Sequence, residues 1–382
     1  MLPLKGITVV ELCQIASGPF AGMLLADMGA DVIKVESPDG DGMRSWPPLT
    51  QGYSENFASL NRNKRSVVLN LKDTADLERA KDLCLSADVV LENFRPGVMD
   101  RLGLGYAALS EHKPSLIYCS ISAYGQKGPR ANEGGFDVTL QAIGGVMSVT
   151  GEPDGEPVKC GVPLTDFAAG LYAAFSITSL LRSVQNGGRG AHLDIPMLGA
   201  TLGIAALQVS EYFGNNRNPV KLGSAHPRNA PYQAFLCKDG YFVLAAGNDS
   251  LFQRTCEAVD RMELVKDPRF TSPELRAANQ VELRRLLEES FANLTVEKCL
   301  KIMNERGVPC APINNYSEAL SDPQVQHYGW VQSMDLPEGT TIRTFGSPIT
   351  INGNGFEIYR RPPALGEHTE EVFSQASARK TA

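Results

Sequence analysis

The sequence of 382 residues lacks the residue patterns of most common catalytic centres. Its five histidines include no pair with the helical spacing of a zinc-binding motif, and its eight cysteines include no Cys-x-x-Cys pair. We therefore expect no metal site, reduced thiols and a cytoplasmic location. A phosphate-binding G-x-x-x-x-G-K-S/T loop and a G-x-S-x-G nucleophile elbow are also missing. These absences leave a carboxylate as the best candidate for a nucleophile.

Excess basic charge and long apolar runs are missing too. The net charge of -7 disfavours nucleic acid as the main partner. The longest apolar runs, 167–181 and 197–209, contain many small and hydroxylated residues and fall short of the ~20 apolar residues that span a bilayer. We expect them to form buried helices and expect no membrane partner. The N-terminal residues lead directly into an apolar strand, so no signal peptide is predicted.

Strands and helices alternate from the N-terminus onward. Six short β-rich runs are separated by helical segments, and they cover 7–13, 31–36, 66–71, 87–93, 116–122 and 191–196. This alternation predicts an α/β fold with a doubly wound, Rossmann-like parallel sheet, which binds ligands at the carboxyl ends of its strands. The loop after the first run, Gln14-Ile-Ala-Ser-Gly-Pro19, is not a G-x-G-x-x-G fingerprint, so NAD binding is disfavoured.

The composition changes near residue 214, where polar loops rich in Gly and Pro begin. A predicted β-hairpin at 232–245 and the helical segments that follow indicate a smaller α+β domain. From about residue 325 the chain returns to β-rich segments. We predict a large domain made of 1–213 and 326–382, and a small domain of 214–325 with its linkers.

Asp166 stands where a loop rich in Gly and Pro meets a predicted helix. The first turn of a helix has free N–H groups and a positive dipole end, which favour an ionised carboxylate at neutral pH. Asp166 or its neighbour Thr165 could serve only as a helix N-cap. Asp166 could instead be a nucleophile that forms a covalent acyl intermediate. The local pattern does not decide between these two roles.

A basic cluster, Asn61-Arg-Asn-Lys-Arg65, precedes the third predicted strand. Such a cluster can be a solvated loop, or it can hold the phosphates of a ligand through its Lys and Arg side chains. Both interpretations stay open at this point.

Taken together, these segments make the whole chain resemble the family III CoA-transferases, the family of formyl-CoA transferase and carnitine CoA-transferase. The motifs that carry the resemblance are Ser17-Gly-Pro19, Leu25–Glu36, Asn63-Lys-Arg-Ser66, Glu92-Asn-Phe-Arg-Pro-Gly97, Asp100-Arg-Leu-Gly103 and Gly161-Val-Pro-Leu-Thr-Asp166. The resemblance implies a Rossmann-like domain built from both chain ends, a small middle domain and an interlocked homodimer. It also implies coenzyme A and acyl-CoA as substrates, with no tightly bound cofactor.

The resemblance assigns the nucleophile to Asp166. Positions that contact CoA in the family fall on Ile15, Ala16, Asn93, Phe94 and Arg101, with Lys64 and Arg65 near the nucleotide. Phe94 could instead be a core residue and Arg101 a surface charge. The candidates for binding the second carboxylate of a dicarboxylic acid are Arg44, Arg62, His226 and Arg228. The Gly247 loop and the N–H groups near Asp166 are candidates for stabilising oxyanions.

Two departures from family patterns narrow the expected substrate. Members that racemise 2-methylacyl-CoA have His at the position of Phe136, and Phe cannot accept a proton. Members that use oxalate have Gln at the position of Ala16 and a long poly-Gly loop where this chain has the shorter loop 223–231. The resemblance therefore implies transfer of CoA from succinyl-CoA to a dicarboxylic acid such as itaconate, glutarate or malate. The alternatives are an intramolecular CoA-transferase acting on a mesaconyl-type acid and a CoA-binding protein without catalysis.

Overall fold

The computed structural model describes residues 2–374, and the chain divides into two compact units. Unit 1 contains the chain up to Val146, the segment Lys159–Arg217 and the chain from Pro323 onward. Unit 2 contains Met147–Val158 and Asn218–Asp322. The sequence placed the outer boundaries at 214 and 325, and it gave no sign that the short segment 147–158 belongs with unit 2.

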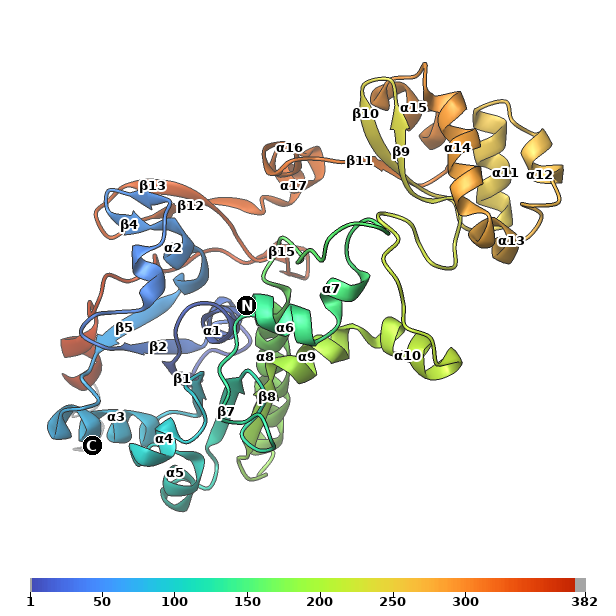
Figure 1. Ribbon diagram of the computed structural model, residues 1–382. Helices are drawn as coiled ribbons and strands as arrows, with labels where there is room; N and C mark the ends of the chain where they lie inside the picture. Colours follow the sequence, from blue (N-terminus) through green and yellow to red (C-terminus); the bar gives the residue numbers. More distant parts are fainter. Residues whose placement is uncertain (1, 375–382) are drawn as a thin grey trace. The chain divides into compact units, whose positions relative to one another are not determined.

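Unit 1 is built around a six-stranded parallel sheet in the order β5-β2-β1-β6-β7-β8 (Figure 1). Its strands are β1 (Thr8–Leu12), β2 (Asp31–Glu36), β5 (Lys64–Val68), β6 (Val89–Glu92), β7 (Ile117–Ser122) and β8 (His192–Pro196). The predicted parallel α/β sheet is therefore confirmed. The strand order reverses between β1 and β6, and in doubly wound sheets the crevice beyond this switch point is where ligands bind.

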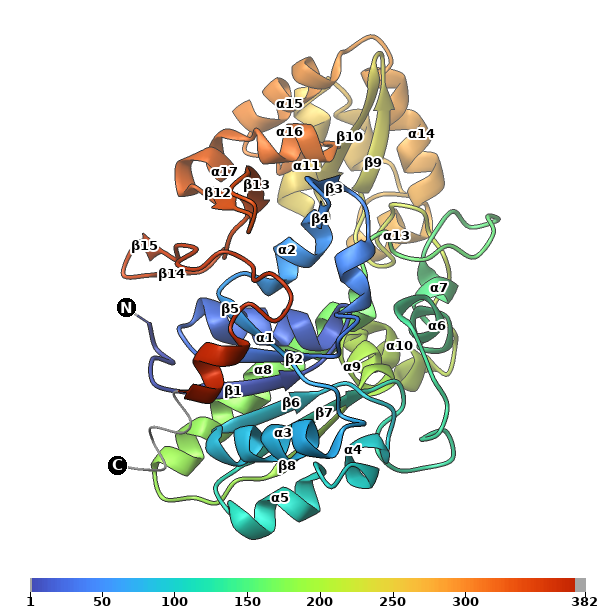
Figure 2. The ribbon, with the colours of Figure 1, turned by 90° about the vertical axis from the view of Figure 1, so that its left-hand side faces the viewer.

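Helices cover both faces of the sheet. The helices of unit 1 are α1 (Ser17–Asp27), η1 (Gly42–Ser45), α2 (Glu55–Asn61), α3 (Thr74–Ser86), α4 (Val98–Arg101), α5 (Tyr106–His112), α6 (Asp137–Ile143), α8 (Leu164–Gln185), α9 (Met197–Ile204), α10 (Ala206–Asn215) and α17 (Pro323–Tyr328), and α7 (Val146–Val149) lies at the unit boundary. One core joins α1 and α8 to the sheet, and a second core joins α3 and α5 to its other face (Figure 2). Val9 belongs to the first core and its neighbour Val10 to the second, which is why β1 is apolar on both faces.

The chain from Pro323 completes unit 1. Its antiparallel pair is β12 (Val331–Asp335) and β13 (Thr341–Phe345), and the short strands of this unit are β3 (Leu49–Thr50), β4 (Tyr53–Ser54), β14 (Thr350–Ile351) and β15 (Asn354–Gly355). Thr369 then contacts the edge strand β5, because the Val68 N–H donates to its Oγ1 at 3.1 Å. The carboxyl-terminal part therefore packs on the sheet that the amino-terminal part begins.

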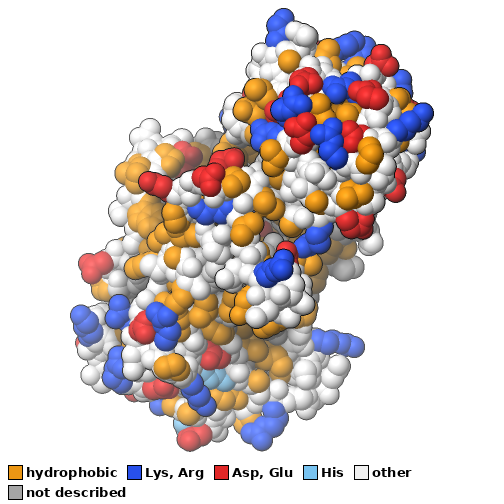
Figure 3. Space-filling view, turned by 45° about the vertical axis from the view of Figure 1, so that its right-hand side comes forward, with side chains coloured by type: hydrophobic (Ala, Val, Ile, Leu, Met, Phe, Trp, Pro, Cys, Tyr) orange, Lys and Arg blue, Asp and Glu red, His pale blue; other side chains and the backbone are white. Residues whose placement is uncertain are grey.

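Unit 2 has a separate core around a three-stranded antiparallel sheet in the order β11-β10-β9. Its elements are β9 (Tyr232–Cys237), β10 (Gly240–Ala245), α11 (Asp249–Ala258), α12 (Glu263–Lys266), α13 (Pro273–Ala278), α14 (Gln280–Phe291), α15 (Val296–Glu305), β11 (Cys310–Pro312) and α16 (Tyr316–Leu320). Phe235, Phe242 and Phe291 are fully buried and contact one another at the centre. On the face shown in Figure 3, Lys, Arg, Asp and Glu side chains mingle over unit 2, whereas hydrophobic side chains gather in patches on unit 1.

The two long apolar runs are only partly buried, in contrast to the prediction. Ala169 and Ala173 of α8 are buried against the sheet, whereas Leu171 and Phe175 on the opposite side are 55% and 70% exposed. α8 is 22 residues long, and it is the one helix in residues 2–374 that is long and apolar enough to cross a membrane. The sequence of this run did not reveal the exposed side, because the helix has apolar side chains of its own on all sides.

Candidate active site

A cleft of about 430 Å³ opens in unit 1 beyond the carboxyl ends of β1, β6 and β7. Its lining comes from the β1–α1 loop, the β6–α4 loop, the end of β7, the segment before α6 and the first turn of α8; the residues used below are Ile15, Ala16, Asn93, Phe94, Arg95, Gly134, Gly135, Phe136 and Asp166. The cleft thus lies at the switch point that the strand order predicts for a ligand. Segments that are distant in sequence meet there, and Asp166 is among their residues.

Asp166 lies in the first turn of α8, but it does not cap the helix. α8 begins at Leu164, so Asp166 is its third residue, and the N-cap position is Pro163 without a side-chain cap. Because Pro has no N–H, Asp166 cannot return a hydrogen bond to the N-cap residue as in a capping box. Within residues 2–374 the Asp166 carboxylate has no hydrogen-bond partner. The N-cap interpretation of Thr165 and Asp166 is therefore wrong, and the carboxylate is available to a ligand.

Burial raises the pKa of Asp166 to about 7, and the neighbouring carboxylate of Asp137 adds to the increase. The expectation that the helix dipole keeps Asp166 fully ionised at neutral pH is therefore wrong. Loss of water around the carboxylate and a like charge nearby outweigh the dipole. A carboxylate with a pKa near 7 is a better nucleophile toward an acyl group than an ordinary Asp, and such perturbed groups concentrate at functional sites.

The β1–α1 loop forms one wall of the cleft in a strained conformation. Ile15 has a φ of 66°, a rare value for a β-branched residue. Its N–H donates to both carboxylate oxygens of Asp41, at 3.1 and 3.2 Å. Asn93 fixes the preceding residue, since it accepts from the Gln14 N–H and donates to the Gln14 carbonyl, both at 2.9 Å. These bonds bring Ile15, Ala16 and Asn93 together at the cleft, and Asp41 is a supporting residue that sequence reasoning missed.

Lys64 does not line the cleft. β5 begins at Lys64, two residues before the predicted start, so Lys64 and Arg65 lie on the strand and not in a loop. The Lys64 Nζ donates to the Asn61 Oδ1 at 2.9 Å and pairs with Glu11 at 2.8 Å. Glu11 also pairs with Lys34 at 3.1 Å, and Lys34 pairs with Asp41 at 2.9 Å. All four ion-pair side chains are fully buried, so this cluster connects β1, β2 and β5 beneath the wall that Asp41 supports.

Arg65 and Arg44, two further candidates, also have carboxylate partners. Arg65 on β5 pairs with Asp31 and with Glu371. Arg44 pairs with Glu36 at 2.7 Å. None of these side chains lines the cleft.

Arg62 and Arg101 also lie away from the cleft lining. Arg62 is 3% exposed and pairs with Asp27 at 2.7 Å. Arg101 is exposed on the short helix α4. The structure thus brings Ile15, Ala16, Asn93 and Phe94 together with Asp166, but not the arginines proposed for the distal carboxylate.

Three further candidates belong to unit 2. His226 and Arg228 lie in the loop before β9, where the His226 Nδ1 accepts from the Arg228 N–H at 3.2 Å. Gly247 follows β10, and its carbonyl accepts from the buried Arg276. They stay candidates for substrate binding.

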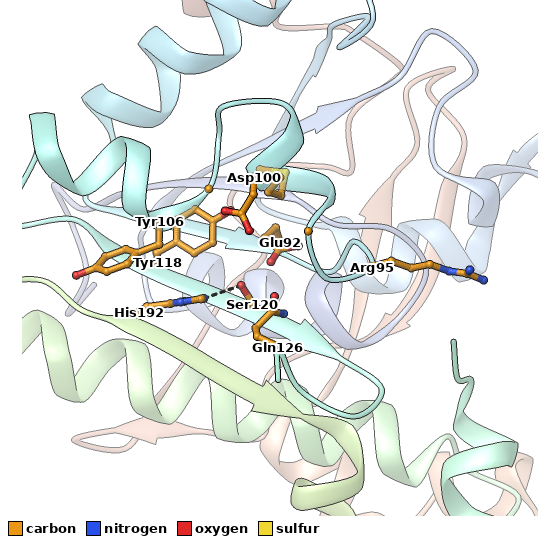
Figure 4. A pocket seen from close by; sticks show the side chains of 11 residues that line it. Glu92, Arg95, Asp100, Tyr106, Tyr118, Ser120, Gln126 and His192 are labelled. Carbon is orange, nitrogen blue, oxygen red and sulfur yellow. Dashed lines mark hydrogen bonds between the residues drawn. The ribbon is translucent and has the colours of Figure 1, made fainter. Parts of the chain in front are cut away.

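Arg95 is a cleft residue that sequence reasoning missed, although it lies inside the quoted motif Glu92–Gly97. It lines the cleft and also borders a small polar cavity of about 20 Å³ below the β6–α4 loop. Figure 4 shows the Arg95 side chain extending away from the other labelled residues of that cavity. It is exposed and has no ion-pair partner within residues 2–374. A free cation in a cleft at the ends of parallel strands is suited to a phosphate group.

Residues around the small cavity hold the β6–α4 loop, which forms part of the cleft lining. Glu92 is 4% exposed there, and its carboxylate accepts from the Phe94 N–H at 2.8 Å. Ser120 and His192 are joined by a hydrogen bond of 2.9 Å (Figure 4). Burial raises the pKa of Glu92 to about 7. The hydrogen bond with Glu92 thus holds the backbone of Phe94, which lines the cleft.

The comparisons with known proteins identify the family of the chain. The family model described as CoA-transferase family III matches residues 4–369. A succinate–glutarate CoA-transferase of Agrobacterium fabrum is 38% identical over 98% of this chain and 95% of its own, and an acetyl-CoA:oxalate CoA-transferase of Acetobacter aceti is 36% identical over 98% and 96%. The crystal structure of a CAIB/BAIF family protein from Brucella suis superposes with a TM-score of 0.87 at 38% identity, covering 98% of this chain and 99% of that one.

The family model and the relatives define the class, an enzyme that acts on CoA thioesters, and its fold contains a large parallel α/β sheet. The chain belongs to CoA-transferase family III, as its sequence motifs implied. CoA-transferases of this kind use CoA thioesters as substrates, so CoA enters as a substrate that passes between acids.

Proposed function

We propose that this enzyme transfers CoA from succinyl-CoA to a small dicarboxylic acid through a covalent intermediate on Asp166. The observation that carries the proposal is the unpaired Asp166 carboxylate, which lines the switch-point cleft with a pKa of about 7. The names of the similar enzymes from Agrobacterium and Acetobacter support the class of acceptor. The free cysteines of the described chain support a reducing, cytoplasmic location.

The mechanism exchanges acyl groups in balanced steps. The Asp166 carboxylate attacks the thioester carbonyl of the donor, which forms a mixed anhydride and releases CoA thiolate. The thiolate attacks the aspartyl carbonyl, which forms an aspartyl-CoA thioester and releases succinate. The acceptor carboxylate attacks this thioester, which forms a second anhydride and again releases CoA thiolate. The thiolate then attacks the acceptor's acyl carbon, which gives the new acyl-CoA and free Asp166.

Each step develops an oxyanion that needs hydrogen-bond donors. Gly134 and Gly135 line the same cleft as Asp166, and within residues 2–374 neither backbone N–H has a partner. A Cβ at Gly135 would lie 2.5 Å from Leu140 and 2.8 Å from Ala123, so only Gly fits this close packing. We propose these N–H groups as oxyanion donors.

An acceptor screen tests the substrate class. The enzyme is incubated with succinyl-CoA and one acid at a time, including glutarate, itaconate, malate, mesaconate and oxalate, and the new CoA thioester is measured by chromatography. We expect dicarboxylates of four or five carbons to be accepted faster than oxalate. Turnover of mesaconyl-CoA without any added acid would instead favour the intramolecular transferase. Binding of CoA without any product would favour the non-catalytic alternative.

Arg95 is expected to bind a phosphate of the CoA substrate. Arg95→Ala should raise the KM for succinyl-CoA about tenfold and leave kcat within about twofold, because the arginine would bind the same phosphate in the ground state and the transition state. Steady-state kinetics with varied succinyl-CoA measure this split. Arg189→Ala removes an exposed arginine from the loop before β8, outside the cleft lining, and serves as the matched control. An unchanged KM in Arg95→Ala would contradict the assignment.

We also propose that two chains form the interlocked homodimer that the sequence resemblance implies. Leu171 and Phe175 on α8, with Leu207 and Phe213 on α10, are 55% to 78% exposed. Monomeric proteins seldom expose apolar patches beyond a few hundred Å². A partner chain that covers these helices would bury them, and stable obligate dimers bury on the order of 2,000 Å² or more.

Light scattering tests this assembly. We expect the measured mass of the wild type in solution to be twice the chain mass of 41.3 kDa. Phe175→Asp combined with Phe213→Asp should give a monomer, because two charges would be buried at the interface without partners. Val281→Asp is the control, since Val281 is 82% exposed on α14 of unit 2 and outside the proposed interface. A wild-type monomer would overturn the proposal.

A further inference from the structure

Asp137 links the helix that carries the proposed nucleophile to the neighbouring helix α6. Asp137 is the first residue of α6 and is half-buried. Its Oδ1 accepts from both the backbone N–H and the hydroxyl of Thr165, at 2.9 and 2.8 Å. Thr165 is fully buried and directly precedes Asp166. The position of the Asp166 turn is therefore set by a carboxylate that lies 28 residues before Thr165 in the chain.

The second oxygen of Asp137 is held just as firmly. The Gln141 Nε2 donates to the Asp137 Oδ2 at 2.7 Å, and the Gln141 Oε1 accepts from the Cys160 N–H at 2.8 Å. Gln141 is fully buried. These bonds hold the Asp137 carboxylate beside Asp166 and leave it no cationic partner within residues 2–374.

We propose that Asp137 is a positioning residue that drives acyl transfer onto Asp166 by charge repulsion as well as by placing the Asp166 turn. This inference rests on the proposed role of Asp166 as the nucleophile. Two carboxylates held close together repel while both are ionised. Acylation converts Asp166 into an uncharged anhydride or thioester and removes the repulsion. Asp137 thus favours formation of the covalent intermediate, and it leaves the free Asp166 carboxylate more basic.

The charged groups around Asp166 are few in the described chain. Asp137 faces it from α6, while Arg95 from the β6–α4 loop and Glu133 from the segment before α6 line the same cleft. Glu133 pairs with Arg130. Among these groups only Asp137 contributes to the raised pKa of Asp166, together with burial. The repulsion can therefore be tested by removing a single charge.

A double variant moves this charge from position 137 to position 141 and preserves the hydrogen bonds. In Asp137→Asn with Gln141→Glu, the new amide oxygen at position 137 still accepts from Thr165, and the amide nitrogen donates to the carboxylate introduced at position 141. That carboxylate also accepts from the Cys160 N–H, so every bond of the wild type has a counterpart. The negative charge then lies at position 141, one hydrogen bond farther from Thr165. Asp137→Asn alone is the second variant, in which the bond to Gln141 is lost but Thr165 stays bound.

The test is the pH dependence of adduct formation. Each protein is mixed with succinyl-CoA without acceptor at pH values from about 5.5 to about 9, quenched in acid, and the adduct on Asp166 is measured by intact mass. The wild-type rate should rise with pH through a midpoint near 7, because only the ionised carboxylate attacks. In Asp137→Asn the midpoint should fall by about one pH unit, and the adduct at equilibrium should decrease several-fold. The double variant keeps a carboxylate at position 141, farther from Thr165, and should show smaller changes in the same direction.

The outcomes separate the two proposals. A lower midpoint and less adduct in both variants, with unchanged melting temperature in the double variant, support the repulsion. A wild-type adduct whose midpoint and yield are the same in the variants would overturn this inference and leave the nucleophile intact. A wild type that never forms an adduct on Asp166 would overturn both. If Asp137→Asn forms less adduct while its midpoint stays that of the wild type, Asp137 acts through hydrogen bonds alone, and the charge role is overturned.

Discussion

Asp166→Ala is expected to lower kcat for CoA transfer by more than about 10³-fold, because a covalent route without its nucleophile retains only binding and oxyanion stabilisation. The fold should survive. The Asp166 carboxylate forms no hydrogen bond within residues 2–374, and its burial near Asp137 is unfavourable. The variant should therefore melt at or above the wild-type temperature. Coupled steady-state kinetics and calorimetry measure the two effects on the same preparation.

The pattern of these two effects distinguishes catalysis from a structural role. If Asp166 were only a helix cap in a protein without catalysis, Asp166→Ala would cost about 1 kcal/mol of stability. Neither the wild type nor the variant would then transfer CoA. Glu133→Gln is the matched control, since Glu133 is an exposed carboxylate that lines the same cleft. It should keep turnover within a few-fold of the wild type. A stable Asp166→Ala enzyme with wild-type turnover would show that the chemistry lies elsewhere.

Glu11→Ala is expected to destabilise unit 1 by about 3–5 kcal/mol, the usual cost of leaving a buried charge without its partner. Glu11 is fully buried and pairs with both Lys34 and Lys64. Lys34 keeps Asp41 after the substitution, whereas Lys64 keeps only uncharged partners, the Pro19 carbonyl and Asn61. Chemical denaturation followed by circular dichroism measures the change in the free energy of unfolding.

The combination of Glu11→Leu with Lys64→Met is the control for this prediction. It removes both charges of the pair and fills similar space, so it should recover most of the lost stability. The cluster also fixes Asp41, which holds the strained Ile15 at the cleft. We therefore expect Glu11→Ala to weaken CoA binding as well. A stability within about 1 kcal/mol of wild type would contradict the proposed role of the cluster.

Most of the sheet could be predicted from the sequence because four of its strands are buried on both faces. β1, β2, β6 and β7 coincide with largely apolar runs, and such runs are typical of parallel sheets. The start of β5 was predicted two residues too late because its first two residues, Lys64 and Arg65, are charged. Lys64 is a charged residue that is fully buried, and the partners that permit this come from α2 and β1. Burial by partners that are distant in sequence leaves no local pattern.

The position of Asp166 in the candidate site could be predicted from the sequence, but the electrostatics of the site could not. The motif that ends at Asp166 indicated the residue, and the structure places it in the cleft with Ile15, Ala16 and Asn93. The pKa of Asp166 is raised by burial and by Asp137, whose position is set by its bond to Thr165. The positive φ of Ile15 depends likewise on Asp41. Both effects arise from tertiary contacts, which spacing along the chain does not reveal.

The central claim is that Asp166 is acylated during turnover, and one measurement tests it most directly. The enzyme is incubated with succinyl-CoA, treated with hydroxylamine, and analysed by intact mass and peptide mapping. The account predicts an adduct with CoA that hydroxylamine converts to a hydroxamate on Asp166, and that is absent in Asp166→Ala. Active enzyme that turns over succinyl-CoA and acceptor without a trace of this adduct, or with an adduct on another residue, would contradict it.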